Sequence, residues 1–290
     1  MTRLWREVRH DSVQRLRGAG IDEPEQELRW IVDHATGRTP AEQVAHLDRP
    51  ATEREVRAVD QMVTRRQAGE PLQYVLGSWG FRTLDLFVDP RVLIPRPETE
   101  VVAGVAIDLL AGLGRPAIAV DLGTGSGAIA LSLAAERWPD IEVWATDVSA
   151  DALAVARANL GGLGRRAAVV RLVEGDWFSA LPVALRGRID VIASNPPYVG
   201  ADEPLPDEVA GWEPRRALVP GPTGLEDIER IVAGAPGWLA PDGVLVVEIG
   251  ERQGAAVRGL AAAAGFAAVD LVPDLAGRDR ALVARRDRAA

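Results

Sequence analysis

The chain has 290 residues, 47% of them apolar, and a formal net charge of −9. This length suggests about two domains, and no apolar run approaches the roughly 18 residues of a membrane span. The sequence has no cysteine, which excludes a disulfide framework and a thiolate metal site. Its charged N-terminus lacks the apolar region of a secretory signal. We therefore expect a cytoplasmic protein with no membrane partner.

All 33 basic residues are arginines, against 42 acidic residues. Residues 1–78 carry a net charge of −1, from 12 arginines and 13 acids, and residues 79–290 carry −8, from 21 and 29. A protein that binds duplex DNA needs a basic surface to displace counterions from phosphates. This balance argues against DNA as a partner. The three histidines all lie near the N-terminus without the spacing of metal ligands, so we expect no metal.

Residues 1–78 are predicted to form a small helical bundle. Thr52 followed by Glu55 is the pattern of a capping box, which opens a helix. A second helix is indicated by apolar residues at helical spacing, at Leu28, Ile31, Val32 and Ala35. A β-hairpin over residues 79–95 is then predicted to link this bundle to the rest of the chain. Its strands are expected at 81–88 and 91–94, on either side of the turn signal Asp89-Pro90.

Strands and helices alternate over the second domain, which we expect at residues 96–290. Apolar strands that alternate with helices predict an α/β fold, with a parallel sheet covered by helices on both faces. Pro241-Asp242-Gly243 is predicted to be a turn, and residues 200–224 a long loop. The strands are expected at 117–121, 141–147, 168–173, 189–193, 244–249, 267–271 and 280–284. The helices are expected at 128–136, 150–160, 225–239 and 252–264.

A glycine-rich turn follows the first strand of this domain. Its glycines allow a ligand to approach the backbone, and the helix that follows offers free N–H groups. The spacing Gly-x-Gly-x-x-Ala, which ends at Ala128, also fits a dinucleotide fingerprint. The turn therefore predicts a nucleotide-like cofactor without fixing which one. The residues that we expect to bind it are Gly123, Thr124, Gly125, Ser126 and Gly127.

Carboxylates end the next two strands. Asp147 lies 20 residues after Gly127, a distance at which an acid can accept hydrogen bonds from both hydroxyls of a ribose. Asp176-Trp177 follows the third strand, where an acid beside an aromatic ring can bind the amine and the face of an adenine. Both observations support a nucleoside cofactor.

The fourth strand ends in Asn195-Pro196-Pro197-Tyr198. Two prolines fix the backbone and remove two N–H donors, which leaves free carbonyls between an amide and an aromatic ring. This arrangement suits a planar nitrogen compound, although Asn-Pro and Pro-Pro also occur in plain turns. The sequence has no Gly-x-x-x-x-Gly-Lys motif, no cysteine nucleophile and no histidine in the second domain. Group transfer from a nucleoside cofactor and hydride transfer both remain possible.

The glycine-rich turn, Asp147 and the turn Asn195–Tyr198 follow one another in this order. With them, the chain resembles S-adenosylmethionine-dependent methyltransferases that act on planar nitrogens. It resembles more closely the HemK/PrmC family, the glutamine N5-methyltransferases of peptide-chain release factors, over nearly its whole length. The turn Asn195–Tyr198 is shared with adenine-N6 DNA methyltransferases, but its combination with Ile94–Glu100 is specific. The resemblance rests further on Gly69–Tyr74, Leu93–Glu100, Asp176–Phe178, Glu213-Pro214 and Ala217-Leu218.

The resemblance implies a class I, Rossmann-like methyltransferase fold with a seven-stranded, mostly parallel sheet behind a helical domain that helps to recognise the substrate. It implies S-adenosyl-L-methionine as cofactor and class-1 release factors as partners, with the glutamine of their Gly-Gly-Gln motif as substrate. The chain is expected to be a monomer. One departure is Pro222-Thr223-Gly224, where many relatives have Asp-Gly before the late helix.

The resemblance also implies roles for single residues. Glycines 123, 125 and 127 approach the cofactor, Asp147 holds its ribose, and Trp177 lies by the adenine, with Asp176 beside it. Asn195 borders both the cofactor and the substrate. Its side-chain oxygen and the Pro196 carbonyl accept the substrate amide, and Pro197 and Tyr198 pack around that amide.

Other functions fit part of the sequence. An adenine-N6 DNA methyltransferase shares Asn195–Tyr198, but only 92 residues follow Tyr198 and leave no room for a basic recognition domain. A nicotinamide-dependent oxidoreductase fits the glycine spacing and leaves the Asn-Pro-Pro-Tyr turn unexplained. A cofactor-binding module without catalysis is a third alternative.

Overall fold

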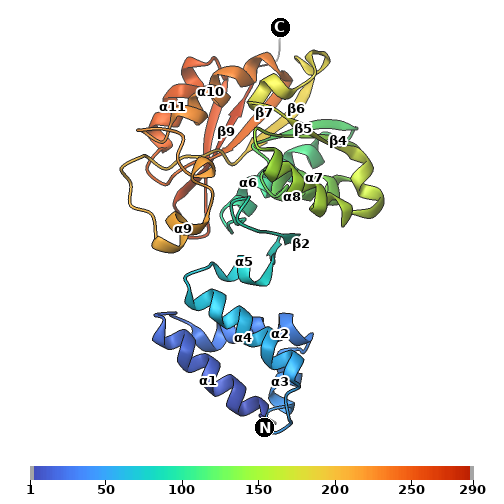
Figure 1. Cartoon of the computed structure of the whole chain (residues 1–290). Helices are drawn as coiled ribbons and strands as arrows, with labels where there is room; N and C mark the ends of the chain where they lie inside the picture. Colours follow the sequence, from blue (N-terminus) through green and yellow to red (C-terminus); the bar gives the residue numbers. More distant parts are fainter. Residues whose placement is uncertain (1–2, 288–290) are drawn as a thin grey trace. The chain divides into compact units, whose positions relative to one another are not determined.

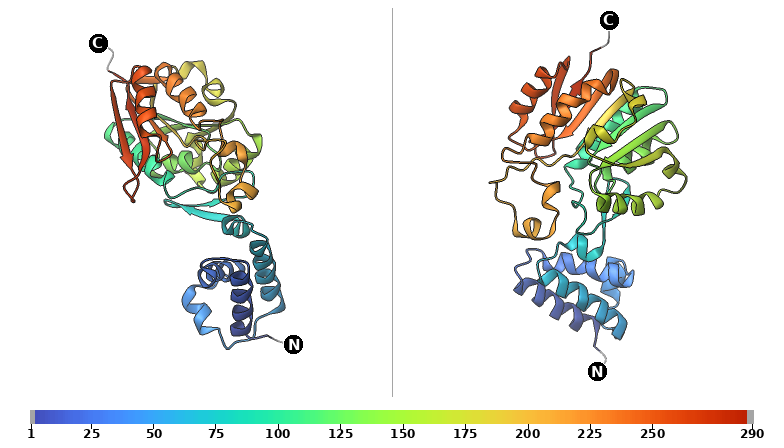
Figure 2. Two further views of the ribbon diagram at one scale, coloured as in Figure 1. Left: turned by 90° about the vertical axis from the view of Figure 1, so that its left-hand side faces the viewer. Right: turned by 45° about the horizontal axis from the view of Figure 1, so that its top comes forward.

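The computed structural model describes residues 3–287 of the chain (Figures 1 and 2). The chain divides into two compact units. One unit consists of Met1–Ser78 together with Leu205–Trp212, and the other of Trp79–Pro204 with Glu213–Ala290. Within residues 3–287, no helix is both long and apolar enough to cross a membrane.

The first unit is a set of helices around an apolar core. The capping box is present, because Thr52 N donates to Glu55 Oε2 over 2.8 Å and Glu55 N donates to Thr52 Oγ1 over 3.3 Å. Its core includes Trp5, Leu16, Leu28, Ile31, Val59, Val63 and Leu72. Its helices are α1 (Trp5–Gly18), α2 (Pro24–Thr36), α3 (Pro40–Ala45), α4 (Glu53–Gln67), α5 (Leu72–Leu76) and α9 (Asp207–Trp212).

Helix α9 comes from the region that the sequence predicted to be only a long loop. It belongs to the first unit although it lies more than a hundred residues after the other helices. The buried guanidinium of Arg66 explains part of this association. Arg66 donates to Glu27 Oε2 over 2.7 Å and to Glu208 Oε2 over 3.4 Å. A buried arginine needs such paired acceptors, and one of them is supplied by α9.

The linking β-hairpin is present, but its turn differs from the prediction. Strands β1 (Ser78–Phe81) and β2 (Leu84–Phe87) form a two-stranded sheet and turn at Arg82-Thr83. The second strand expected at residues 91–94 is absent, and Asp89-Pro90 is not the hairpin turn. The apolar residues that suggested this strand, such as Val92 and Ile94, are buried. The segment that carries them is irregular and not a strand.

The second unit contains a seven-stranded sheet in the order β5-β4-β3-β6-β7-β9-β8. Neighbours are parallel from β5 to β7, and β9 is antiparallel to both β7 and β8. The predicted α/β fold with a mostly parallel sheet is confirmed. The strands are β3 (Ala117–Leu122), β4 (Ile141–Asp147), β5 (Val170–Glu174), β6 (Ile189–Ser194), β7 (Leu239–Glu248), β8 (Ala268–Pro273) and β9 (Asp279–Arg285).

Helices cover both faces of this sheet (Figure 2). Alternate residues of β3 point to opposite sides, so Ala119 packs with one apolar cluster and Val120 with the other. Helices α6 (Thr99–Gly112) and α7 (Ala128–Arg137) contribute to the first cluster, and α10 (Glu226–Gly234) and α11 (Gly254–Ala263) to the second. Helix α8 (Ala150–Gly161) follows β4.

The predicted turn at residues 241–243 lies inside β7. Ile189 of β6 pairs with Leu239, whereas Val191 pairs with Val244, so β7 has three extra residues at this point. The strand therefore bulges and continues, with Asp242 at a positive φ of 64°. A turn signal here marks an irregularity within a strand.

Candidate active site

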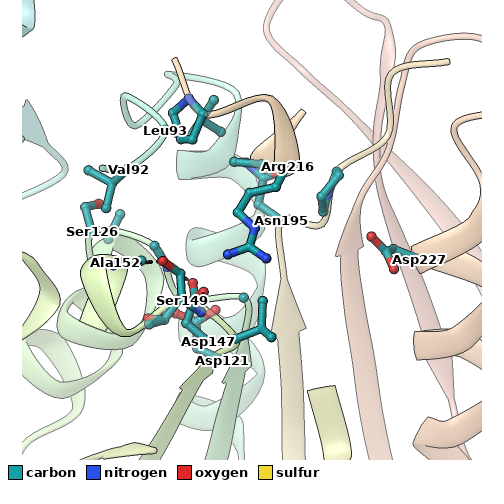
Figure 3. Close-up of a pocket in the computed structure, with 18 of the residues that line it drawn as sticks. Val92, Leu93, Asp121, Ser126, Asp147, Ser149, Ala152, Asn195, Arg216 and Asp227 are labelled. Carbon is teal, nitrogen blue, oxygen red and sulfur yellow. Dashed lines mark hydrogen bonds between the residues drawn. The ribbon is translucent and has the colours of Figure 1, made fainter. Parts of the chain in front are cut away.

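A cavity of about 350 Å³ lies where the carboxyl ends of β3, β4, β5 and β6 meet (Figure 3). In the sheet, β3 has β4 on one side and β6 on the other, so the chain leaves this edge in opposite directions. Such a switch point is the usual ligand site of an open α/β sheet. The predicted site residues that line it are Gly123, Thr124, Gly125, Ser126, Asp147, Asp176, Trp177, Asn195 and Pro197.

The glycine turn forms one wall of the cavity. Its Gly123 and Thr124 N–H groups donate to the Thr146 carbonyl of β4 over 2.9 and 2.8 Å, which holds the turn against the next strand. Gly123 has a φ of +73°, and a Cβ there would lie 3.0 Å from the Trp177 ring. Gly127 does not line the cavity. A Cβ at this position would lie 2.9 Å from the Leu131 side chain, so glycine is needed here for packing.

Asp147 joins the end of β4 to the glycine turn. Its Oδ2 accepts from Gly125 N over 2.9 Å and its Oδ1 accepts from Ser149 N over 2.8 Å. Burial raises the pKa of Asp147, and these backbone hydrogen bonds oppose the rise. The carboxylate is thus fixed at the cavity wall with acceptor capacity to spare.

Asp121 is a cavity residue that the sequence analysis did not single out. It is 1% exposed at the end of β3, and burial raises its pKa to about 7. Oδ2 accepts from Thr124 Oγ1 over 2.7 Å and from Ala130 N over 3.0 Å, whereas Oδ1 has no hydrogen-bond partner within residues 3–287. A buried acid with a spare oxygen at a cavity is suited to a cationic ligand group. Its place just before the glycine turn was the available signal.

Trp177 and Asp176 occupy the wall after β5. Trp177 has a φ of 46°, unusual for a bulky residue, and its Nε1 donates to Asp227 Oδ1 over 3.3 Å. The indole is therefore held between Gly123 and α10. The Asp176 carboxylate, in contrast, is bound by Arg230, so the structure shows it in an ion pair at the place where we expected it to meet an adenine amine.

Asn195 lies at the end of β6 and lines the cavity. Its Nδ2 donates to Thr99 Oγ1 of α6 over 3.0 Å. Pro196 and Tyr198 are not among the lining residues. The Tyr198 hydroxyl instead donates to Glu248 Oε1 over 3.2 Å, and burial and this carboxylate raise the pKa of Tyr198. The structure thus brings Asn195 and Pro197 to the cavity and turns Tyr198 towards β7.

Glu213 connects two segments that lie far apart in the sequence. Its side chain is 1% exposed; it accepts from Ile94 N over 3.1 Å and from Arg96 over 2.5 Å. The neighbouring residues Pro95 and Pro214 both line the cavity. Glu213 therefore joins the two segments that carry Pro95 and Pro214, although they lie more than a hundred residues apart in the sequence.

Arg216 points its guanidinium into the cavity (Figure 3). The other two lining arginines, Arg91 and Arg230, are in ion pairs with Asp89 and Asp176. Among residues 3–287, no ion pair within 4.0 Å occurs for Arg216, although its charge lowers the pKa of Asp147. It lies in the long 200–224 segment, where no local sequence pattern marked it.

Comparison with known proteins identifies the family. The family model described as “PrmC N-terminal domain” matches residues 7–77, and “Methyltransferase small domain” matches residues 104–206. The release factor glutamine methyltransferase of Cereibacter sphaeroides is 43% identical over 280 residues, which cover 94% of this chain and 95% of that protein. The chain belongs to the release factor glutamine methyltransferase family. The enzyme of the same name from Moorella thermoacetica is 41% identical over 97% of this chain and 98% of its own.

A solved structure independently supports the fold. A methyltransferase from Pyrococcus furiosus superposes with a TM-score of 0.51 at 21% identity, over 71% of this chain and 90% of its own. This degree of likeness concerns the fold alone. Together with family membership, it confirms the predicted methyltransferase fold and leaves the nicotinamide-dependent alternative without support.

The residues of the cavity fit the expected cofactor, S-adenosylmethionine. The volume of the cavity lies in the range of small-molecule sites. Asp147 offers carboxylate oxygens for hydroxyls, Trp177 offers an aromatic face, and the buried carboxyl of Asp121 lies at the cavity, where its negative charge favours a cation nearby. A cofactor that carries a nucleoside at one end and ammonium and sulfonium charges at the other matches this donor set. The family is thus an S-adenosylmethionine-dependent methyltransferase family, as predicted.

Proposed function

We propose that this chain transfers a methyl group from S-adenosyl-L-methionine to the side-chain amide nitrogen, N5, of the glutamine in the Gly-Gly-Gln motif of class-1 peptide-chain release factors. The observation that carries the proposal is Asn195, an amide that lines the cavity beside the glycine turn, in a chain 43% identical to a release factor glutamine methyltransferase. The Asn-Pro-Pro-Tyr turn alone specifies only a planar nitrogen.

An amide nitrogen is a weak nucleophile, because its lone pair is delocalised into the carbonyl group. The bound cofactor supplies an electrophilic methyl group on a sulfonium. Asn195 Oδ1 and the Pro196 carbonyl accept the two N–H groups of the substrate amide, which favours the positive charge that develops on nitrogen. They also fix the nitrogen in line for displacement. No strong base is needed, because the proton can leave after transfer.

Other residues of the cavity hold the cofactor. Asp147 takes the ribose hydroxyls, Trp177 lies against the adenine, and the glycine turn lets the backbone approach. We assign Asp121 to a cationic group of the cofactor, because its Oδ1 has no partner within residues 3–287. Asp176 has a smaller part in this proposal than the sequence suggested, because Arg230 already binds its carboxylate.

Replacement of Asn195 tests the substrate side. Asn195→Ala removes one acceptor that acts on the developing charge, and such a loss lowers kcat by about 100-fold or more. The affinity for S-adenosylmethionine should change little. Near-normal methylation of a release factor by the variant would remove Asn195 from the mechanism.

The first unit is proposed to recognise the protein substrate. Among the described residues 3–287, only residues of the second unit line the cavity. The match of residues 7–77 to the family's N-terminal domain gives the first unit a family-specific character. Deletion of residues 1–78 should raise KM for the release factor and leave the cofactor affinity measurable. Unchanged KM in a variant that binds cofactor normally would contradict this role.

We also propose that the protein acts in the cytoplasm as a monomer and does not methylate DNA. The −8 charge of residues 79–290 supports the exclusion of DNA. A methylation assay with duplex DNA tests the exclusion of DNA, and sedimentation of the purified protein tests the monomer; labelled DNA or a stable dimer would overturn the corresponding statement.

A further inference from the structure

A side chain from a distant part of the sequence binds the backbone carbonyl of Tyr198. Gln253 lies directly before α11, in the segment that follows β7. Its Nε2 donates to the Tyr198 carbonyl over 3.0 Å and to the Gly224 carbonyl over 3.2 Å. The two N–H groups of one amide therefore join the last residue of the Asn-Pro-Pro-Tyr turn to the segment just before α10.

A third hydrogen bond fixes the orientation of the Gln253 amide. The backbone N–H of Gly250 donates to Gln253 Oε1 over 2.9 Å. An amide oxygen accepts hydrogen bonds and an amide nitrogen donates them. A reversed side chain would therefore present N–H groups to an N–H group, and an oxygen to two carbonyls. Only the observed orientation gives all three backbone groups a partner.

Tyr198 is held at its side chain as well as at its carbonyl. Its hydroxyl donates to Glu248 Oε1 over 3.2 Å, at the end of β7. Gly224 packs closely against the carbonyl, and a Cβ at this position, where φ is +76°, would clash with the Tyr198 oxygen. The chain beyond the turn is also paired, because Val199 N donates to the Leu218 carbonyl over 2.9 Å. Tyr198 is thus a fixed end of the turn.

The carbonyls of the turn consequently differ in what they can bind. The Tyr198 carbonyl is taken by Gln253, whereas the Pro196 carbonyl accepts no hydrogen bond among the described residues 3–287. Each of the two prolines restricts its own φ and the conformation of the residue before it. With Tyr198 fixed at the far end, the Asn195 side chain and the Pro196 carbonyl keep a defined place relative to each other.

We propose that Gln253 is a positioning residue for the methyl transfer, which holds the turn in the shape that leaves Asn195 at the cavity and the Pro196 carbonyl free for the substrate amide. In-line displacement needs the nitrogen at a defined distance and direction, so a small shift of the turn lowers the rate strongly. Gln253 itself does not line the cavity. Its effect therefore falls on kcat and not on the affinity for S-adenosylmethionine. This inference rests on the proposed function, because it names a residue that supports the same site.

Two substitutions separate hydrogen bonding from packing. Gln253→Glu keeps the shape of the side chain but replaces the N–H donors by a carboxylate oxygen that faces two carbonyls. Gln253→Met keeps the length of the side chain and removes its polar groups. We expect kcat to fall about tenfold in Gln253→Met, the size of one lost hydrogen bond, and to fall further in Gln253→Glu. A packing role predicts the reverse order, because glutamate matches the shape of glutamine more closely.

Arg252→Gln is the matched control. It makes the same change in net charge as Gln253→Glu at the neighbouring position, on a side chain that is 91% exposed. Its kcat should stay within about twofold of the unaltered enzyme, as is usual for a surface substitution. Isothermal titration calorimetry should give the same affinity for S-adenosylmethionine in the three variants and the unaltered enzyme.

The outcomes separate this inference from the proposed function. Normal kcat in Gln253→Met, the reverse order of the two variants, or a loss of cofactor affinity as large as the loss in kcat would overturn the positioning role. If Gln253→Glu does not fold, the kcat and cofactor affinity of Gln253→Met decide. An unaltered enzyme that binds S-adenosylmethionine but methylates no release factor would instead overturn the proposed function itself.

Discussion

The carboxylate of Asp147 accepts a hydrogen bond from the backbone N–H of Gly125 over 2.9 Å. This contact ties the end of β4 to the turn after β3, so one acid shapes the turn and also faces the cavity. A change at Asp147 therefore affects both the ligand and the backbone that surrounds it.

The first prediction concerns this acid. Asp147→Ala should weaken the binding of S-adenosylmethionine by about tenfold or more, because it removes a charged acceptor for the ribose and frees the Gly125 N–H. Isothermal titration calorimetry measures the affinity. Asp140→Asn, an exposed acid just before the same strand, is the matched control and should bind normally. Unchanged affinity in Asp147→Ala would remove it from the cofactor site.

The second prediction concerns the close approach of Gly123 to Trp177. Gly123→Ala would place a Cβ 3.0 Å from the indole at a φ of +73°, so the ring must move and the backbone is strained. We expect both weaker cofactor binding and a lower Tm. Gly259→Ala in α11 meets no atom within 4 Å and should raise stability by up to about 1 kcal/mol. A Gly123→Ala variant with normal affinity would show that this packing is dispensable.

The third prediction concerns the pH dependence of stability. The folded-state pKa of Asp121, about 7, is above its ordinary value of 3.8, so ionisation of this acid disfavours the folded protein. Its contribution to the free energy of unfolding is present below about pH 4 and is lost as the pH rises through about 7. Asp121→Asn removes this loss. The variant should be more stable than the unaltered protein at pH 8, and the difference should shrink at pH 5.

Urea unfolding at the two pH values measures this difference. Asp202→Asn, an exposed acid, is the control and should change neither value. The same Asp121→Asn protein should bind S-adenosylmethionine more weakly, because the cationic group loses its partner. If Asp121→Asn gains less stability over the unaltered protein at pH 8 than at pH 5, the buried-charge explanation is contradicted.

The sequence predicted those parts of the site that are local. The glycine turn, Asp147 and Asn195 each directly follow a strand, and the carboxyl ends of parallel strands meet at one edge of the sheet. The predicted order of strands and helices therefore already brought these residues together. The predicted position of the hairpin turn was wrong because Val92 and Ile94 are buried although their segment is irregular. Such a segment has the same apolar pattern as a buried strand.

The remaining site residues depend on contacts between distant segments. Thr99 reaches Asn195 across 96 positions, and Glu213 reaches Ile94 across 119. Arg216 enters the cavity from a segment without a periodic pattern. No local signal in the sequence specifies such pairings, and the buried acid Glu248 looked like any other strand end. The resemblance pointed to Ile94–Glu100 and Glu213-Pro214, and the structure supplies the contact that joins them.

The most direct test of the proposed activity is transfer of a radiolabelled methyl group from S-adenosylmethionine to a purified class-1 release factor. The same factor with its Gly-Gly-Gln glutamine replaced is the control. The account predicts label on the unaltered factor, located to that glutamine by mass spectrometry, and none on the control. Equal labelling of both factors, or labelling of neither by an enzyme that binds the cofactor, would contradict it.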